Sequence, residues 1–141
     1  MINKFRESIF ESAKKYSNVV LLTTDDLYDK DFAKFFHDRQ LNLGPGLANA
    51  LAASVGFAAR AKMPFVLFNS CDLLSAMDQV KRLIVEPNLN VKMIGVGKSD
   101  NASFLEVMSG IEIVLPSSRE ELNENISQMV NSYGPSYLEL R

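Results

Sequence analysis

Short apolar runs that alternate with helix-forming segments constrain the fold of this chain more than any other feature. The run at 19–24, Val-Val-Leu-Leu-Thr-Thr, is apolar or β-branched at every position, which is typical of a strand buried on both faces. Further strands are predicted at 40–43, 64–68, 90–96, 111–115 and 136–140, and helices at 2–16, 47–61, 73–85, 103–108 and after the N-cap Ser118. This alternation predicts an α/β fold, a three-layer parallel sheet with helices on both faces.

The composition describes one domain without a strongly charged surface. The 141 residues fit a single core, so one domain is predicted over 1–141, and 47% hydrophobic residues suffice to fill that core. A net charge of −2 offers no basic surface to nucleic acid or anionic lipid, and no apolar stretch is typical of a signal peptide or a membrane span. We therefore expect a cytoplasmic protein with no nucleic-acid partner and no membrane partner.

The cysteine, histidine and acidic residues argue against a metal site. Cys71 has no second cysteine with which to form a disulfide, as expected in a reducing compartment, and one cysteine with one histidine cannot build a structural zinc site. Asp25, Asp26, Asp29 and Asp31 lack the spacing of a calcium loop, so solvated aspartates are favoured over a metal site, in a loop or short helix at 25–38 that phenylalanines anchor. We predict no metal site within this chain.

Residues that follow the predicted strands mark the candidate site, because ligands bind at the carboxyl ends of the strands in a parallel sheet. Those ends lie at 24–26, 43–47, 69–72, 95–101 and 116–118. Gly-Lys-Ser at 97–99 matches the end of a phosphate loop, but Lys92 and Asp100 stand where the phosphate and dinucleotide motifs require glycine, which favours a plain turn. No motif pairs His37 as a general base or Cys71 as a nucleophile, so we favour structural roles for both.

Several blocks of sequence carry, in order, a resemblance that covers nearly the whole chain. They lie at 20–25, 39–44, 50–61, 62–66, 76–81, 88–92, 114–117 and 134–138. With these blocks the chain resembles the pyrimidine-binding domain of the transketolase family, which includes transketolase, deoxyxylulose-phosphate synthase and the pyruvate dehydrogenase β subunit. The resemblance implies a thiamine-diphosphate-binding fold in which the cofactor lies between two domains, with the diphosphate and Mg²⁺ held by the other domain.

Three departures from the family pattern fall where the pyrimidine of the cofactor would lie. Leu47 replaces the glutamate that, in relatives, bonds the aminopyrimidine and promotes ylid formation. Asp72 stands where relatives carry an aromatic residue that stacks on the ring, and the loop at 97–105 lacks the histidine and the Glu-Asp pair of relatives. The resemblance therefore implies no catalytic residue in this chain, and a vestigial cofactor or ligand pocket formed by Asp25, Asn42, Gly44, Leu47, Asn69 and Asp72.

Two functions follow from the resemblance, beside a third and weaker one. We expect first a non-catalytic pseudoenzyme that forms a homodimer and acts as a binding or interaction module, with its interface at Gly46, Ala50, Ser54, Ala58, Asp78 and Gln79. The alternative is a subunit of a split transketolase-type transferase that a separate diphosphate-binding chain completes. Thiamine diphosphate and Mg²⁺ bind only in that case, and no cofactor binds to this chain alone. The third function is a sensor that binds a small ligand in the vestigial pocket.

Overall fold

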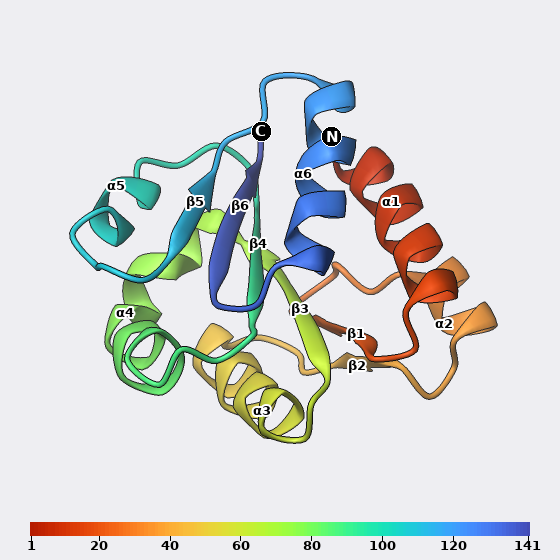
Figure 1. The fold of residues 1–141 in the computed structure, drawn as a ribbon, viewed down its shortest axis with the longest axis horizontal. Coiled ribbons are helices and arrows are strands. Elements are labelled where there is room, and N and C mark those ends of the chain that lie inside the picture. Colours follow the sequence, from red (N-terminus) through yellow and green to blue (C-terminus); the bar gives the residue numbers. More distant parts are fainter.

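A computed structural model describes residues 1–141 and contains six strands between two layers of helices (Figure 1). The strands are β1 (Val19–Thr23), β2 (Gln40–Asn42), β3 (Met63–Asn69), β4 (Lys92–Val96), β5 (Glu112–Val114) and β6 (Ser136–Leu140). The helices are α1 (Ile2–Lys15), α2 (Lys30–Phe35), α3 (Leu47–Ala59), α4 (Met77–Gln79), α5 (Ala102–Leu105) and α6 (Arg119–Asn131). A 3₁₀ helix (Ser70–Ala76) precedes α4, and a π-helix (Val80–Val85) follows it.

The strands lie in the order β2-β1-β3-β4-β6-β5, and every neighbouring pair is parallel. The carboxyl ends of all six strands therefore meet at one edge of the sheet, which is the edge predicted to carry the site. Helices α1, α2 and α6 cover one face of the sheet, and α3, α4 and α5 cover the other (Figure 1). The predicted three-layer α/β fold is confirmed.

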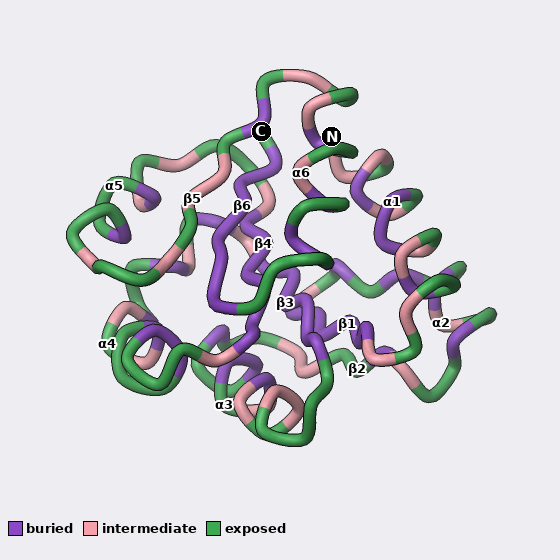
Figure 2. The backbone as a smooth tube through the Cα atoms, viewed as in Figure 1, coloured by how far each residue is buried: buried purple, intermediate pink, exposed green.

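Two apolar cores fill the spaces between the sheet and its helical layers. Phe5 of α1 and Leu122 of α6 lie in one core, and Leu51 of α3 and Leu105 of α5 lie in the other. All five residues of β1 are buried, as expected of a strand covered on both faces. In Figure 2 the buried positions run through the strands in the middle of the molecule. None of the helices has both the length and the apolar character that crossing a membrane requires.

The helical segment between β3 and β4 is less regular than the single helix predicted at 73–85, and the spacing of its buried side chains explains why. Leu73 and Ala76 are both fully buried and three positions apart, which suits a 3₁₀ helix. Ile84 and Val85 are both buried although they are adjacent, and the wider turn of a π-helix brings both to the core. The predicted helix at 103–108 is also shorter, because α5 ends at Leu105.

The phenylalanines predicted to anchor residues 25–38 do not all face the core. Phe32 and Phe36 are buried, as predicted. Phe35, in contrast, is 61% exposed, and its ring contacts those of Phe10 and Phe36 at the surface. Phe32 and Phe36 are four positions apart and therefore face the sheet together. Phe35 lies beside this buried face, not within it.

Arg39 holds the start of β2 against the end of α1. Its Nε donates a hydrogen bond to the carbonyl of Val19 at 2.9 Å, Nη1 to that of Ala13 at 3.0 Å and Nη2 to that of Tyr16 at 2.8 Å. The guanidinium also lies over the ring of Phe36, 4.6 Å from its centre. The guanidinium thereby supplies donors to the carbonyls of Ala13 and Tyr16, which the end of α1 leaves without partners. The dipole of α1 also favours a positive charge at this end of the helix.

We expect Arg39→Met to lower the free energy of unfolding by about 2 kcal/mol, since hydrogen bonds from a charged donor to three carbonyls are lost. Arg60→Met is the matched control, because Arg60 is exposed at the end of α3, and should change stability by less than about 0.5 kcal/mol. Urea denaturation of the three proteins measures both effects. Equal stability of the two variants would contradict the role given to Arg39.

Candidate functional site

Four of the six residues predicted for the pocket lie together at the carboxyl ends of β1, β2 and β3. Asn69 Nδ2 donates to Asp25 Oδ2 at 3.2 Å, and Asn42 Nδ2 donates to the Asp25 carbonyl at 3.5 Å. The amide of Asp25 donates to the Gly44 carbonyl at 3.0 Å, and the amide of Gly44 donates to Asn42 Oδ1 at 3.2 Å. We call Asp25, Asn42, Gly44 and Asn69 the edge cluster.

The backbone of the edge cluster is strained at Asp25. Its φ of +53° lies in the left-handed region, as does the φ of +68° at Gly44. Glycine adopts this region without penalty, whereas a residue with a Cβ loses about 1–2 kcal/mol there. The hydrogen bonds to Gly44 and Asn69 hold Asp25 in place. Because strained residues other than glycine concentrate at functional sites, Asp25 is the member of the cluster that most favours a binding role.

Leu47 begins α3 and points into the core. It is only 4% exposed and belongs to the same apolar cluster as Leu22, Leu51 and Leu73. Leucine neither donates nor accepts a proton, and these apolar neighbours would make a carboxylate at this position costly to bury. Residue 47 therefore places no ionisable group at the start of α3.

Asp72 is not hydrogen-bonded to the edge cluster. It lies in the 3₁₀ helix after β3, where its carboxylate accepts a contact from Cys71 Sγ at 3.9 Å and its carbonyl accepts from Ser75 Oγ at 2.6 Å. Cys71 is exposed beside it. Of the residues assigned to the pocket, Asp72 and Leu47 are thus the two that the hydrogen bonds of the edge cluster leave out.

The other motif residues do not form a second site. His37 precedes β2 and is exposed, so it lies toward the amino edge of the sheet, away from the edge cluster. Asp29 caps α2 by accepting hydrogen bonds from the amides of Asp31 and Phe32, both at 3.1 Å. No three His, Cys, Asp or Glu side chains are grouped so that they could hold a metal ion.

The loop after β4 uses its amides inside the protein. Gly97 N donates to the carbonyl of Leu140 at 2.7 Å, Ser99 N to Glu139 Oε1 at 3.2 Å and Asn101 N to Ser99 Oγ at 3.3 Å. A phosphate loop needs such amides free to bind the anion. These hydrogen bonds support the preference for a plain turn over a phosphate loop.

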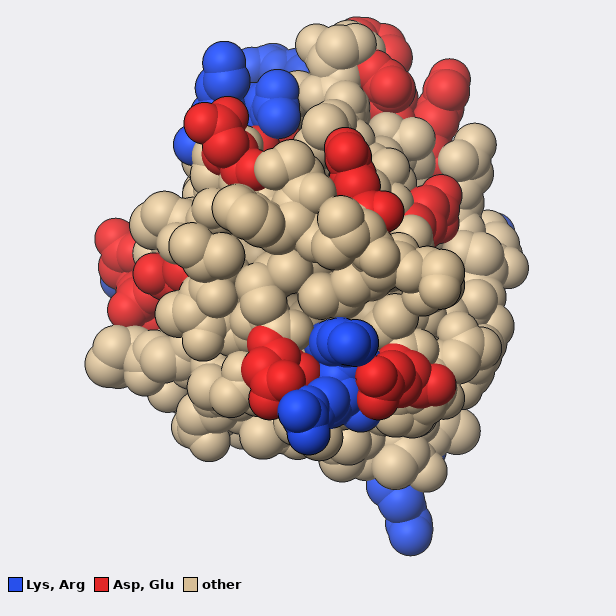
Figure 3. Space-filling model, turned by 90° about the vertical axis from the view of Figure 1, so that its left-hand side faces the viewer, with Lys and Arg blue, Asp and Glu red and all other residues tan.

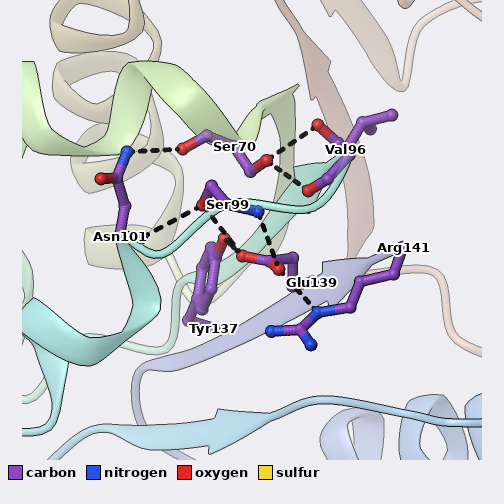
Figure 4. Close-up of polar contacts among 8 residues, drawn as sticks. Ser70, Val96, Ser99, Asn101, Tyr137, Glu139 and Arg141 are labelled. Carbon is purple, nitrogen blue, oxygen red and sulfur yellow. Dashed lines mark hydrogen bonds and ion pairs between the residues drawn. The ribbon is translucent and has the colours of Figure 1, made fainter.

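A buried carboxylate that the sequence analysis did not single out fixes this loop (Figure 4). The side chain of Glu139, on β6, has no exposed surface. It accepts hydrogen bonds from Tyr137 Oη at 2.9 Å, Ser99 N at 3.2 Å, Ser99 Oγ at 3.1 Å and Arg141 Nε at 2.9 Å. These four donors, one of them charged, compensate for burying the carboxylate. The one signal in the sequence is an acidic residue inside an apolar strand, two positions after Tyr137 and therefore on the same face.

Ser70 and Asn101 extend this network to the end of β3. Ser70 Oγ donates to the carbonyls of Val96, at 3.0 Å, and Gly97 (Figure 4). Asn101 Nδ2 donates to the carbonyls of Ser70 and Cys71, both at 3.2 Å. The segments that follow β3 and β4 are therefore joined to each other and, through Ser99, to β6.

Gly95 makes room for the Tyr137 hydroxyl within the network. A Cβ at residue 95 would lie 3.0 Å from Ser70 Cβ and closer still to Tyr137 Oη, so a larger residue would push Tyr137 away. Burial, together with the adjacent Glu139 carboxylate, raises the pKa of Tyr137 well above its ordinary value. The hydroxyl consequently stays protonated and remains a donor to Glu139.

The small-residue row of α3 packs inside the chain, which corrects part of the predicted interface. Ala50 and Ser54 have no exposed surface, because this side of α3 packs against β3 and the helical segment after it. Neither residue can contact a second chain in this conformation. Gly46, Ala58, Asp78 and Gln79 keep accessible surface.

Comparison with known sequences yields weak but extensive similarity. No family model matches the chain. The chain is 24% identical over 153 residues to a protein of Methanocaldococcus jannaschii described as a putative transketolase C-terminal section, covering 96% of this chain and 48% of that relative. It is 24% identical over 147 residues to the 1-deoxy-D-xylulose-5-phosphate synthase of Desulfotalea psychrophila, covering 94% of this chain and 23% of the synthase.

Solved structures are similar to the whole chain. A split gene transketolase, described as an inactive β4 tetramer, superposes with a TM-score of 0.90 at 20% identity and covers 98% of this chain and 50% of its own. The transketolase of Campylobacter jejuni superposes with a TM-score of 0.84 at 13% identity and covers 98% of this chain and 25% of its own. The resemblance to the transketolase family is confirmed. The chain has the fold of a transketolase C-terminal domain and spans about half the length of the archaeal relative.

Proposed function

We propose that this chain is a non-catalytic, transketolase-like domain that acts by associating with another chain in the cytoplasm. The observation that carries the proposal is Leu47, a buried apolar side chain at the position where the family resemblance places a glutamate. A proton cannot be held or moved at that position. We therefore expect neither thiamine diphosphate nor Mg²⁺ to bind to the chain alone. The exposed free thiol of Cys71 supports a reducing compartment.

The edge cluster is what remains of a ligand pocket in this proposal. Asp25 Oδ2 accepts a hydrogen bond from Asn69, and the side chain of Asn42 is exposed beside the same backbone. Leu47 and Asp72, the other two residues predicted for the pocket, lie outside these hydrogen bonds. A small polar ligand that pairs with the carboxylate of Asp25 and the amide of Asn69 would suit this arrangement.

The second candidate function is that of a subunit in a split transketolase-type enzyme. It is favoured by the similarity to a split gene transketolase and to a protein described as a transketolase C-terminal section. A separate diphosphate-binding chain would then hold the cofactor and Mg²⁺. When bound, thiamine diphosphate supplies a carbanion at C2 as its chemistry.

Titration calorimetry with thiamine diphosphate and Mg²⁺ tests the proposal. The chain is titrated alone and after mixing with a separately produced diphosphate-binding domain of the transketolase type, and exchange of the C2 proton is followed by NMR. We expect no binding heat from the chain alone, and no accelerated exchange of the C2 proton with or without the second chain, because Leu47 cannot assist proton removal. Heat together with exchange in the mixture would establish the split enzyme and contradict the non-catalytic function.

Leu47→Glu and Leu47→Gln form the matched pair of variants for this experiment. Both place a polar group of similar size in the same core, but only glutamate can exchange a proton. If the mixture binds the cofactor, Leu47→Glu should raise the exchange rate above that of Leu47→Gln. Equal rates in the two variants would show that residue 47 does not take part.

A further inference from the structure

We propose that residues 70–85 are a two-state element, in which the 3₁₀ and π turns change together into one continuous α-helix, so that a change at either end of the segment alters the other end. The segment comprises the 3₁₀ helix Ser70–Ala76, α4 and the π-helix Val80–Val85. The inference goes beyond the proposed function, because the two forms exchange whether or not a ligand or a second chain binds.

The apolar residues of this segment have the spacing of a regular α-helix. Leu73, Met77, Val80 and Ile84 follow one another at intervals of four, three and four positions, so a continuous helix places all four on one face. In the structure Leu73, Val80 and Ile84 are fully buried and Met77 is partly buried. An α-helix therefore buries the same apolar side chains that the observed turns bury.

The exposed side of the segment also suits an α-helix. Asp78 and Arg82 are four positions apart, and Arg82 Nε lies 2.8 Å from Asp78 Oδ1. Ion pairs with this spacing are typical of α-helices. Figure 3 looks onto the side of the molecule that carries α4 and α5, and charged side chains stand at its surface. No contact of this ion pair opposes the α-helical form.

Contacts outside the segment hold its first half as a 3₁₀ helix. Asn101 Nδ2 donates to the carbonyls of Ser70 and Cys71, both at 3.2 Å, and Ser70 Oγ donates to the carbonyl of Val96 at 3.0 Å. A 3₁₀ helix of seven residues is uncommonly long, because its hydrogen bonds have poorer geometry than those of an α-helix. The 3₁₀ form consequently depends on these contacts from the loop after β4.

Burial of Val85 holds the second half as a π-helix. The amide of Glu86 donates to the carbonyl of Lys81 at 2.9 Å, and that of Leu89 donates to the carbonyl of Ile84 at 3.0 Å, each across five positions. This wider turn brings Val85, which is 7% exposed, to the core beside Ile84. In an α-helix successive side chains turn by about 100°, so Val85 leaves the core when Ile84 stays in it.

The two irregular halves compensate each other in length, which couples them. A 3₁₀ helix rises by about 2.0 Å per residue and an α-helix by about 1.5 Å, so the first half is longer than seven α-helical residues by about 3.5 Å. A π-helix winds more residues into each turn and rises less per residue. If the first half alone became α-helical, it would pull Ile84 out of its place in the core or displace Asn69. The change also reaches the edge cluster, because Asn69 binds Asp25.

NMR of Val85→Ala tests the coupling far from the substitution. The smaller side chain gains less from burial, so the variant should shift the population toward the α-helix. We expect proton contacts across four positions, typical of an α-helix, to replace contacts across two positions at residues 70–76. Leu83→Ala is the matched control, since Leu83 is 39% exposed in the same π-helix, and it should leave residues 70–76 unchanged.

NMR of Asn101→Ala tests the coupling in the other direction. Loss of its two hydrogen bonds should give residues 80–85 the contacts and carbon chemical shifts of an α-helix, whereas Ser103→Ala, at an exposed position two residues later, should not. Changes confined to the neighbourhood of each substitution, or a segment that unfolds, would overturn the proposal. If Asn101→Ala fails to fold, as circular dichroism would show, the comparison of Val85→Ala with Leu83→Ala decides alone.

Discussion

Replacing Glu139 by leucine should lower the free energy of unfolding by about 3 kcal/mol, because donors in the interior lose the carboxylate that accepts their hydrogen bonds. The leucine fills a similar volume but accepts none of the four hydrogen bonds. The donors of Tyr137 and Ser99 are then left without partners inside the protein, whereas the exposed guanidinium of Arg141 can be hydrated. Urea denaturation measures the loss, and amide exchange at Ser99 reports directly on release of the loop after β4.

Two further variants show whether the stability lost in Glu139→Leu comes from the hydrogen bonds of this carboxylate. Glu139→Gln keeps one acceptor oxygen and should be destabilised by less than Glu139→Leu. Glu124→Leu removes an exposed carboxylate from α6 and should change stability by about 0.5 kcal/mol or less. If Glu139→Leu were as stable as Glu124→Leu, the network in Figure 4 would not hold the loop.

The free energy of unfolding should rise with pH between about 8 and 9.5, because of a buried lysine at the amino edge of the sheet, opposite the edge cluster. Lys92, at the start of β4, is 1% exposed and donates from Nζ to the carbonyls of Ser132 at 2.9 Å and Gly134 at 2.8 Å. Burial lowers the pKa of Lys92 from 10.5 to about 8, while the charge of Glu112 opposes the shift. Above pH 8 the folded chain therefore binds fewer protons at this site than the unfolded chain, so raising the pH favours folding.

The expected gain is about 2 kcal/mol between pH 8 and 9.5, out of about 3 kcal/mol available up to the ordinary lysine pKa. At about pH 7 and below, Lys92 is protonated in both the folded and the unfolded state and contributes no slope. Above pH 10 the raised pKa of Tyr137 acts in the other direction, so the window ends before it. Denaturation at several pH values should show the rise in the wild type and in Lys98→Met, and its absence in Lys92→Met. A flat profile for the wild type would refute the assignment.

Much of the fold could be predicted because it depends on local pattern. The buried run of β1 and the N-cap of α6, where Ser118 Oγ accepts from the amide of Glu121 at 3.1 Å, follow from a few neighbouring residues. The irregular helix after β3 was not predicted, since its 3₁₀ and π turns depend on how Leu73 and Ile84 reach a core made by other elements.

The candidate site could be predicted only in part. Topology placed Asp25 and Asn69 at the same edge, and the structure joins them by a hydrogen bond. The role of Glu139 was missed because its partners come from a loop about 40 positions earlier and from its own strand, a pairing that no local motif encodes. The row with Ala50 was assigned to an interface because spacing along a helix does not tell which neighbour covers it.

The position of β6 determines when this fold can be completed during synthesis. It is the sixth strand along the chain, yet it lies between β4 and β5, and β5 has no other neighbour in the sheet. A nascent chain that has emerged through β5 can form only the four strands β2-β1-β3-β4, while β5 waits for its partner. The carboxylate of Glu139 and the carbonyl of Gly134 that binds Lys92 are also synthesised after β5. The contacts at both ends of β4 therefore form only after residues 132–140 have been synthesised.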